Sequence, residues 1–156
     1  MKELKIIDKF NPCREAINYL KTKDTFKRAW KDCPRGDWML WLAQRLKVNL
    51  KTLTKAKALC ALTVRHLMKD ERSINACKVA LKYSKGKATK KQLDAAAYAA
   101  ADADAAAYAA AAADADAAYA AYAAYAAAYA GAYAGAAIKN QQKTADICRE
   151  VLTSGS

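Results

Sequence analysis

Apolar residues recur three and four positions apart along most of this chain, and no segment alternates apolar and polar positions. Spacing of three and four places side chains on one face of an α-helix, whereas alternation is typical of a β-strand. The pattern therefore predicts an all-α protein, a helical bundle of about six to seven helices. The predicted helices cover residues 13–21, 25–32, 38–46, 50–68, 74–85, the alanine-rich part 92–137, and residues 138–152.

Residues with capping preferences stand at the ends of these predicted helices. The expected N-caps are Asn11 (with Pro12 at the first helical position), Asp24 or Thr25, Asp37, Asn49 and Ser73, and Thr89 with Gln92 forms a capping box. In the turn before residue 37, Pro34 fixes φ and Gly36 permits a positive φ. Gly86 suits the left-handed position that ends the helix over 74–85.

An alanine-rich stretch, residues 95–137, dominates the second half of the chain. Alanine is the strongest intrinsic helix former, so the stretch is predicted to be helical even without tertiary packing. Unbroken, it extends roughly 64 Å, whereas a compact domain of this size spans roughly 40 Å. The stretch is therefore one projecting helix, two helices folded into a hairpin, or the spine of an oligomer. Gly131 and Gly135 favour a close helix–helix crossing.

Tyrosines give this alanine-rich helix one distinctive face. Five of them fall within about 80° of one another around the helix axis, and a sixth lies beside them. The six are Tyr108, Tyr119, Tyr122, Tyr129 and Tyr133, with Tyr125 beside them. They either supply volume for packing on neighbouring helices or form an exposed strip that binds a partner. The second interpretation makes partner-binding residues of Tyr119, Tyr122, Tyr125 and Tyr129.

Length and composition favour a single domain over residues 1–152, followed by a disordered tail over 153–156. The five cysteines are odd in number and none forms a CxxC pair, so we expect reduced, mostly buried thiols. The N-terminus lacks the apolar run of a signal sequence, and aspartates in the alanine-rich helix exclude a membrane span. We therefore expect a cytoplasmic protein.

The net charge of +12 is unevenly distributed. Residues 1–91 carry 24 Lys and Arg against 8 Asp and Glu, whereas residues 92–156 carry 3 against 7. The basic part either faces an anionic partner, which is a nucleic acid or an acidic protein, or is a lysine-rich solvated surface.

The sequence predicts no catalytic residues, metal ligands or cofactor. The single histidine, His66, lies inside a predicted helix, and Cys60 points about 120° away from it. A Ser-His-Asp set and a glycine-rich phosphate loop are both missing from the sequence. The Asp-x-Asp pairs at 102–104 and 114–116 point to different sides of a helix, which favours solvated charges over a metal site. We therefore predict that the protein is not an enzyme.

The densest group of candidate functional residues is the segment CPRGDWMLWL, residues 33–42. Arg35 and Asp37 flank a glycine at a predicted helix start, and Trp38 and Trp41 share a face because they are three apart. As a structural device, the aspartate caps the helix, the arginine binds carbonyls or a carboxylate, and the tryptophans anchor the core. As a functional device, an arginine beside two tryptophans has the composition of a protein-binding hot spot. All four are candidate partner-binding residues.

This CPRGDWMLWLAQR segment resembles one in a family of small proteins from bacterial and phage genomes that are described as immunity proteins of polymorphic-toxin systems. The resemblance continues through ALKYSKGKATKKQLDAAAYAAADADAAAYAA and ends with TADICREVL, so it covers about residues 27–152. The basic N-terminal part departs from the family pattern. The family offers no catalytic residues to carry over.

The resemblance implies an all-helical, non-enzymatic protein that binds and blocks a toxin or, in a phage, a host defence factor, in the cytoplasm of a bacterial host. Inhibitors of basic nuclease toxins carry complementary acidic surfaces, so the basic part favours an acidic target, unless the acidic alanine-rich helix makes the contact. Two other functions stay open. These are nucleic-acid binding by residues 1–91, and a structural or oligomeric phage component built on the alanine-rich helix.

Overall fold

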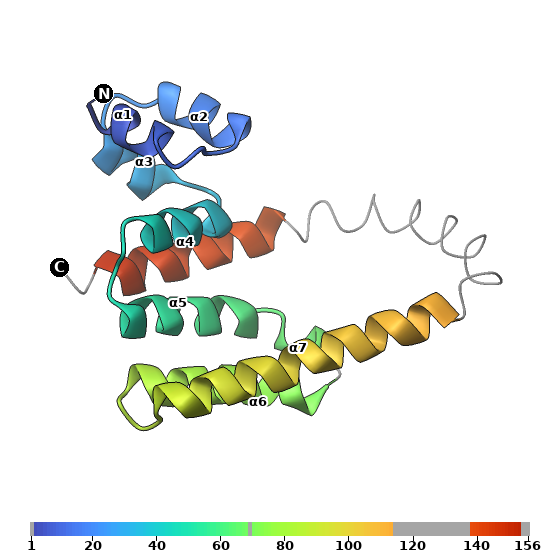
Figure 1. Cartoon of the computed structure of the whole chain (residues 1–156). Helices are drawn as coiled ribbons and strands as arrows, with labels where there is room; N and C mark the ends of the chain where they lie inside the picture. The colour runs from blue at the N-terminus through green and yellow to red at the C-terminus, as the bar shows by residue number, and fades with distance from the viewer. Residues whose placement is uncertain (1, 69, 114–137, 154–156) are drawn as a thin grey trace. The chain divides into compact units, whose positions relative to one another are not determined.

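The computed structural model describes residues 2–68, 70–113 and 138–153, and helices make up all the regular structure in these ranges (Figure 1). The α-helices are α1 (Lys2–Asp8), α2 (Arg14–Lys21), α3 (Phe26–Asp32), α4 (Gly36–Arg45), α5 (Leu50–Leu62), α6 (Glu71–Ser84), α7 (Lys90–Ala113) and a last helix over residues 138–153, with a 3₁₀ helix, η1 (Arg65–Leu67), after α5. Because these ranges contain no strand, the predicted all-α fold class is confirmed.

The chain divides into two compact units. The first unit comprises Met1–Cys60 and Gln141–Ser156, so segments far apart in the sequence build it together. The second unit comprises Ala61–Asn140. The single domain over residues 1–152 stays a prediction.

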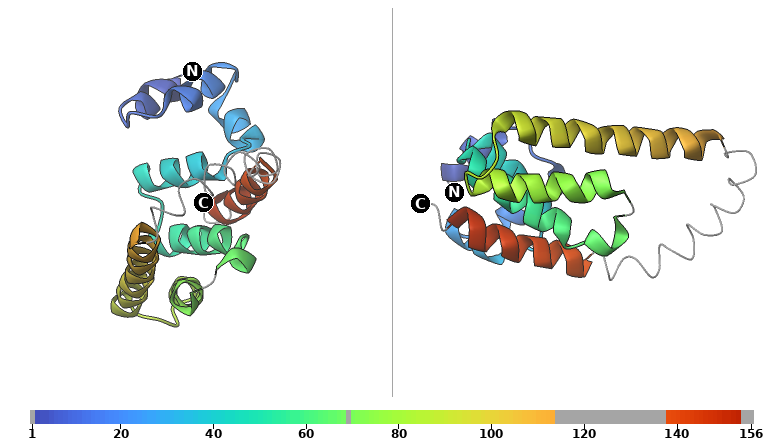
Figure 2. Two further views of the ribbon diagram at one scale, coloured as in Figure 1. Left: turned by 90° about the vertical axis from the view of Figure 1, so that its right-hand side faces the viewer. Right: turned by 90° about the horizontal axis from the view of Figure 1, so that it is seen from below.

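The core of the first unit lies where α4, α5 and the helix over 138–153 pack together (Figures 1 and 2). Alanines at the contact, Ala43, Ala56 and Ala145, are at most 1% exposed, and their small side chains allow the helix backbones to approach closely. The Cys60 and Cys148 sulfurs lie 4.0 Å apart in this core. The full set of buried residues is Cys33, Met39, Ala43, Leu53, Ala56, Cys60, Ala145, Cys148, Val151 and Leu152.

A second buried cluster joins the first four helices of the same unit. Ile7 from α1, Leu20 from α2, Ala29 from α3 and Leu42 from α4 form it. The sequence pattern predicted no helix over residues 2–8, because the segment is short and mostly charged. Burial of Ile7 in this cluster provides the tertiary packing that stabilises so short a helix.

Three of the predicted helix starts are confirmed by side-chain hydrogen bonds. Thr25 Oγ1 accepts from the Arg28 amide (3.2 Å), and Asn49 Oδ1 accepts from the Lys51 amide (3.0 Å). The capping box before α7 is also present. The Gln92 amide donates to Thr89 Oγ1 (3.2 Å), and the Thr89 amide donates to Gln92 Oε1 (2.8 Å).

Two predicted N-caps are wrong because a neighbouring residue takes the role. Asn11 has a φ of 52°, a left-handed conformation that asparagine tolerates, and it follows α1 instead of starting α2, whose N-cap is Cys13. Asp70, not Ser73, caps α6 by accepting from the Arg72 amide at 2.8 Å.

The predicted roles of Gly36 and Asp37 also need correction. The helix α4 begins at Gly36 with Arg35 as its N-cap, so Asp37 lies in the first turn, and its carboxylate binds the Arg35 guanidinium. Gly36 is not in the left-handed region, which among the described glycines only Gly86 occupies. It is required because Thr144 packs directly against it, and the Cβ of any other residue would lie 2.6 Å from the Thr144 carbonyl carbon.

The predicted helix over 50–68 is shorter in the structure, where α5 ends at Leu62. Two successive β-branched residues, Thr63 and Val64, follow this end, and such residues disfavour continuation of a helix. Thr63 Oγ1 hydrogen-bonds to Asn140 Oδ1 at 2.7 Å. His66 lies beyond α5, in η1, where it is exposed.

The second unit contains an antiparallel hairpin of α6 and α7, which lie side by side (Figure 2). Gly86, at a φ of 72°, ends α6 as predicted. Its amide donates to the Tyr83 carbonyl (2.9 Å), and the Lys87 amide donates to the Lys82 carbonyl (2.8 Å). These two bonds make a Schellman motif, which satisfies the last carbonyls of α6 and holds the turn in one conformation.

The alanine-rich stretch is helical as predicted as far as Ala113. Residues 114–137 lie outside the described residues, so the choice between one helix and two stays open. The side chains of the tyrosine face, from Tyr108 to Tyr133, also lie outside the described set. The prediction for the cysteines is confirmed, because all five are thiols outside disulfides, and Cys33, Cys60, Cys77 and Cys148 are buried, whereas Cys13 is exposed.

Candidate functional site

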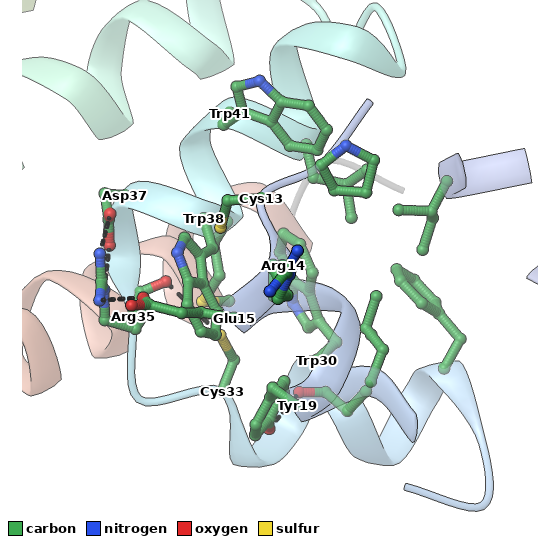
Figure 3. Close-up of a pocket in the computed structure, with 18 of the residues that line it drawn as sticks. Cys13, Arg14, Glu15, Tyr19, Trp30, Cys33, Arg35, Asp37, Trp38 and Trp41 are labelled. Carbon is green, nitrogen blue, oxygen red and sulfur yellow. Dashed lines mark hydrogen bonds and ion pairs between the residues drawn. The ribbon is translucent and has the colours of Figure 1, made fainter. Parts of the chain in front are cut away.

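A cavity of about 900 Å³ lies in the first unit, walled by α1 to α4 and the loops that connect them (Figure 3). We call it the aromatic pocket, because five aromatic side chains line it: Tyr19, Phe26, Trp30, Trp38 and Trp41. Its volume is within the range of roughly 300–1,000 Å³ that is typical of ligand sites. Charged groups also line it, from Arg14, Glu15, Arg35 and Asp37.

Arg35 is held in one orientation by three neighbours. Its Nε and Nη2 atoms donate to the two carboxylate oxygens of Asp37 at 2.8 and 2.7 Å, a bidentate pair. Its guanidinium lies 4.7 Å from the ring centroid of Trp38, and its Nη1 atom lies 3.8 Å from Glu15 Oε2 (Figure 3). The hydrogen bond from Arg35 lowers the pKa of the Asp37 carboxyl, so the pair stays ionised at neutral pH. Arg35 therefore presents a positive charge and a flat surface at the pocket without a large ordering cost.

Tyr19 connects α2 to α3 and packs beside the same tryptophan. Its hydroxyl donates to the Ala29 carbonyl at 2.9 Å, and its ring centroid lies 5.9 Å from that of Trp38. The pKa of Tyr19 is raised to about 12, first by burial and then by the nearby Cys33 and Asp32. The folded state therefore favours the neutral phenol over the phenolate.

Tyr19→Phe should reveal this raised pKa as a difference in alkaline stability. The stabilisation by the neutral phenol is complete below the unfolded-state pKa of 10.0 and is lost as the pH rises through about 12. We expect wild type to exceed the variant in free energy of unfolding by about 1 kcal/mol at neutral pH, because of the hydrogen bond. The difference should shrink above pH 10, as measured by urea unfolding at a series of pH values. A difference that stays constant to pH 12 would contradict the raised pKa.

Among the described residues, Trp30 Nε1 is the one buried side-chain polar atom without a hydrogen-bond partner. Its Nε1 atom is inaccessible to solvent, and the residue lines the aromatic pocket. A buried donor without an acceptor costs about 1–3 kcal/mol. Because solvent does not reach Nε1, a molecule bound in the pocket does not reach it either, and the cost is borne by the packing of Trp30.

Two thiols line the pocket, the exposed Cys13 and the buried Cys33, and Cys33 is suited to packing. The Cys33 sulfur donates to the Arg35 carbonyl at 3.5 Å, and burial raises the pKa of the thiol. It therefore remains protonated at neutral pH, and a protonated thiol is a poor nucleophile. In the ranges that the structure describes, no three His, Cys, Asp or Glu side chains come together as a possible metal site. The arrangement of the aromatic pocket is suited to binding.

The structure brings together four of the residues predicted from the sequence. Arg35, Asp37, Trp38 and Trp41 all line the aromatic pocket, and Trp41 also lies 5.7 Å from the Arg45 guanidinium carbon. The structural interpretation of these residues is partly confirmed, because Arg35 does bind a carboxylate and both tryptophans pack against buried clusters. The tyrosines at 119, 122, 125 and 129 lie outside the described residues.

Sequence reasoning missed the contribution of α2 and α3 to the pocket. Tyr19 and Trp30 lie 14 and 3 residues before the CPRGDWMLWL segment, which begins at residue 33, and no local spacing relates them to Trp38. The only available signal was composition, since all three tryptophans of the chain lie between residues 30 and 41.

No known protein family, curated protein or solved structure matches the chain. Over the described residues, every helix is too short or too polar to cross a membrane.

Proposed function

We propose that this chain is a protein-binding inhibitor of the immunity or phage anti-defence type, which blocks a toxin or a host defence factor by direct contact and without catalysis. The observation that carries the proposal is the aromatic pocket with Arg35 held beside Trp38. Tryptophan and arginine are the residue types most enriched among binding hot spots, and here they are ordered before any partner arrives.

The pocket favours a partner segment that inserts an apolar or aromatic side chain. The aromatic walls would bury its apolar surface. The charges that line the pocket balance, with Arg14 and Arg35 against Glu15 and Asp37, so the sign of the partner's charge is argued from the wider surface. The excess of basic residues in positions 1–91 favours an acidic partner and disfavours a basic nuclease as the target. The alternative of an oligomer built on the alanine-rich helix depends on residues 114–137, outside the described residues.

Site-specific photo-crosslinking in the native host tests the proposal. A photoreactive amino acid in place of Trp41 should capture one discrete protein, and nuclease treatment should leave the product unchanged. The same amino acid in place of the exposed Tyr98 serves as the positional control and should not capture that protein. The captured protein, once purified, should be inhibited by the chain in its own activity assay. A product common to both positions, or one removed by nuclease, would contradict the proposal.

Arg35→Ala should weaken binding to the captured protein more than tenfold, as measured by isothermal titration calorimetry. The affinity would fall because the variant lacks the Arg35 cation at the pocket and because the Asp37 and Trp38 side chains would no longer be held in place by Arg35. The matched control is Arg28→Ala, an arginine of the same unit that is exposed and does not line the pocket. Equal affinities of the two variants would exclude the pocket as the binding surface.

A further inference from the structure

The α6–α7 hairpin concentrates lysines at its closed end. Residues 78–91 contain six lysines and no Asp or Glu. Five of them lie in the turn or within one helical turn of it, and the sixth lies one turn further along α6. All six are exposed, namely Lys78, Lys82, Lys85, Lys87, Lys90 and Lys91. We call this group the lysine cluster.

The positive charge of the lysine cluster is almost uncompensated. Within the described residues, Lys90 is its only member in an ion pair, with Asp94 at 2.7 Å. The Schellman motif and the capping box fix the turn from both sides, so the ammonium groups project from a rigid backbone. Confining so many like charges to one end of a hairpin is unfavourable unless an anionic partner neutralises them.

An exposed aromatic residue lies beside the cluster. Tyr98 is 74% exposed, seven residues after Lys91, so both point in nearly the same direction from α7, about 10 Å apart along its axis. Tyr98 and Lys91 therefore share one side of α7 near the closed end of the hairpin.

From this arrangement we infer that the α6–α7 hairpin binds single-stranded nucleic acid, with phosphates on the lysine cluster and a base stacked on Tyr98. Lysine ammonium groups neutralise successive phosphates without sequence preference, and an exposed tyrosine ring provides a stacking platform for an unpaired base. Both partners would use the charges, but only a single strand offers unpaired bases that stack on the flat, exposed ring. This inference is independent of the function proposed for the aromatic pocket.

Fluorescence anisotropy of the full chain with a short labelled oligo(dT) tests the inference. We expect binding that weakens as NaCl increases, because each phosphate contact releases counterions. The triple variant Lys85→Gln, Lys87→Gln, Lys91→Gln should bind at least tenfold more weakly at about 0.1 M NaCl, and the slope of log K against log salt should fall by about 2. Tyr98→Ala should weaken binding at least fivefold with the slope nearly unchanged, because it removes stacking and no charge.

The matched control neutralises three exposed lysines elsewhere, Lys27, Lys51 and Lys55, and changes the net charge by the same amount. If this control weakens binding as much as the cluster variant, the attraction comes from overall charge and the inference is overturned. Polyglutamate is also tested as a competitor at equal charge concentration. If it displaces oligo(dT) and Tyr98→Ala leaves the affinity unchanged, the hairpin binds an acidic protein and the inference is overturned. Circular dichroism of each variant establishes that the helices are retained.

Discussion

Gly36→Ala is expected to lower the free energy of unfolding by at least about 2 kcal/mol. The added Cβ would overlap Thr144 Oγ1 and lie 2.6 and 2.7 Å from its carbonyl carbon and Cβ. The carbonyl carbon belongs to the backbone of the helix over 138–153, so a change of rotamer does not relieve the overlap and the two helices must separate. The higher helix propensity of alanine returns at most about 1 kcal/mol. Urea unfolding followed by tryptophan fluorescence measures the loss in the first unit, where all three tryptophans lie.

Two further variants show whether the close backbone approach is responsible. Thr144→Ala removes the hydroxyl but keeps the carbonyl carbon, so the double variant with Gly36→Ala should regain only part of the lost stability. Gly86→Ala is the matched glycine, whose cost of about 1 kcal/mol should come from its positive φ alone. Full recovery in the double variant would mean that only the hydroxyl opposes a side chain at position 36.

Met39→Ala should lower the free energy of unfolding by about 3 kcal/mol. Met39 is 2% exposed and belongs to the core between α4, α5 and the helix over 138–153. Its truncation removes buried apolar surface and leaves a cavity that the surrounding helices fill only in part. Urea unfolding by tryptophan fluorescence again measures the effect.

Leu46→Ala provides the comparison for this core truncation. Leu46 follows α4 directly and is 48% exposed, so its truncation should cost less than about 1 kcal/mol. Equal losses in the two variants would contradict the assignment of Met39 to the core. Because Met39 also lines the aromatic pocket, the calorimetric titration of Met39→Ala should be made well below its unfolding midpoint.

The fold class was predictable because helical periodicity and capping are local properties of the sequence. Thr25, Asn49, Gly86 and the Thr89–Gln92 pair behave as their residue types suggest. The errors arose where a contact distant in sequence decides the local structure. Gly36 looked like a turn glycine, yet its role depends on Thr144, which is 108 positions later and which no local pattern reveals.

The candidate site was predictable only in its contiguous part. Arg35, Asp37, Trp38 and Trp41 stood out because they occur within seven residues. The bidentate pair between Arg35 and Asp37 follows from that proximity, since two opposite charges only two residues apart attract each other whatever the rest of the fold is. The contributions of Tyr19 and Trp30 required the packing of α2, α3 and α4 around one volume, which is a tertiary property.

The first unit is closed by the last helix of the chain, and this has a consequence for its synthesis on the ribosome. The Cys148 sulfur donates to the Gly36 carbonyl, and Arg149 donates to the Cys33 carbonyl, across 112 and 116 positions of sequence. Until residues 138–153 emerge, α4 and α5 expose the apolar faces that this helix covers. The first unit of the nascent chain therefore cannot complete its fold while residues 61–140 are translated. During that interval its apolar faces are accessible to chaperones.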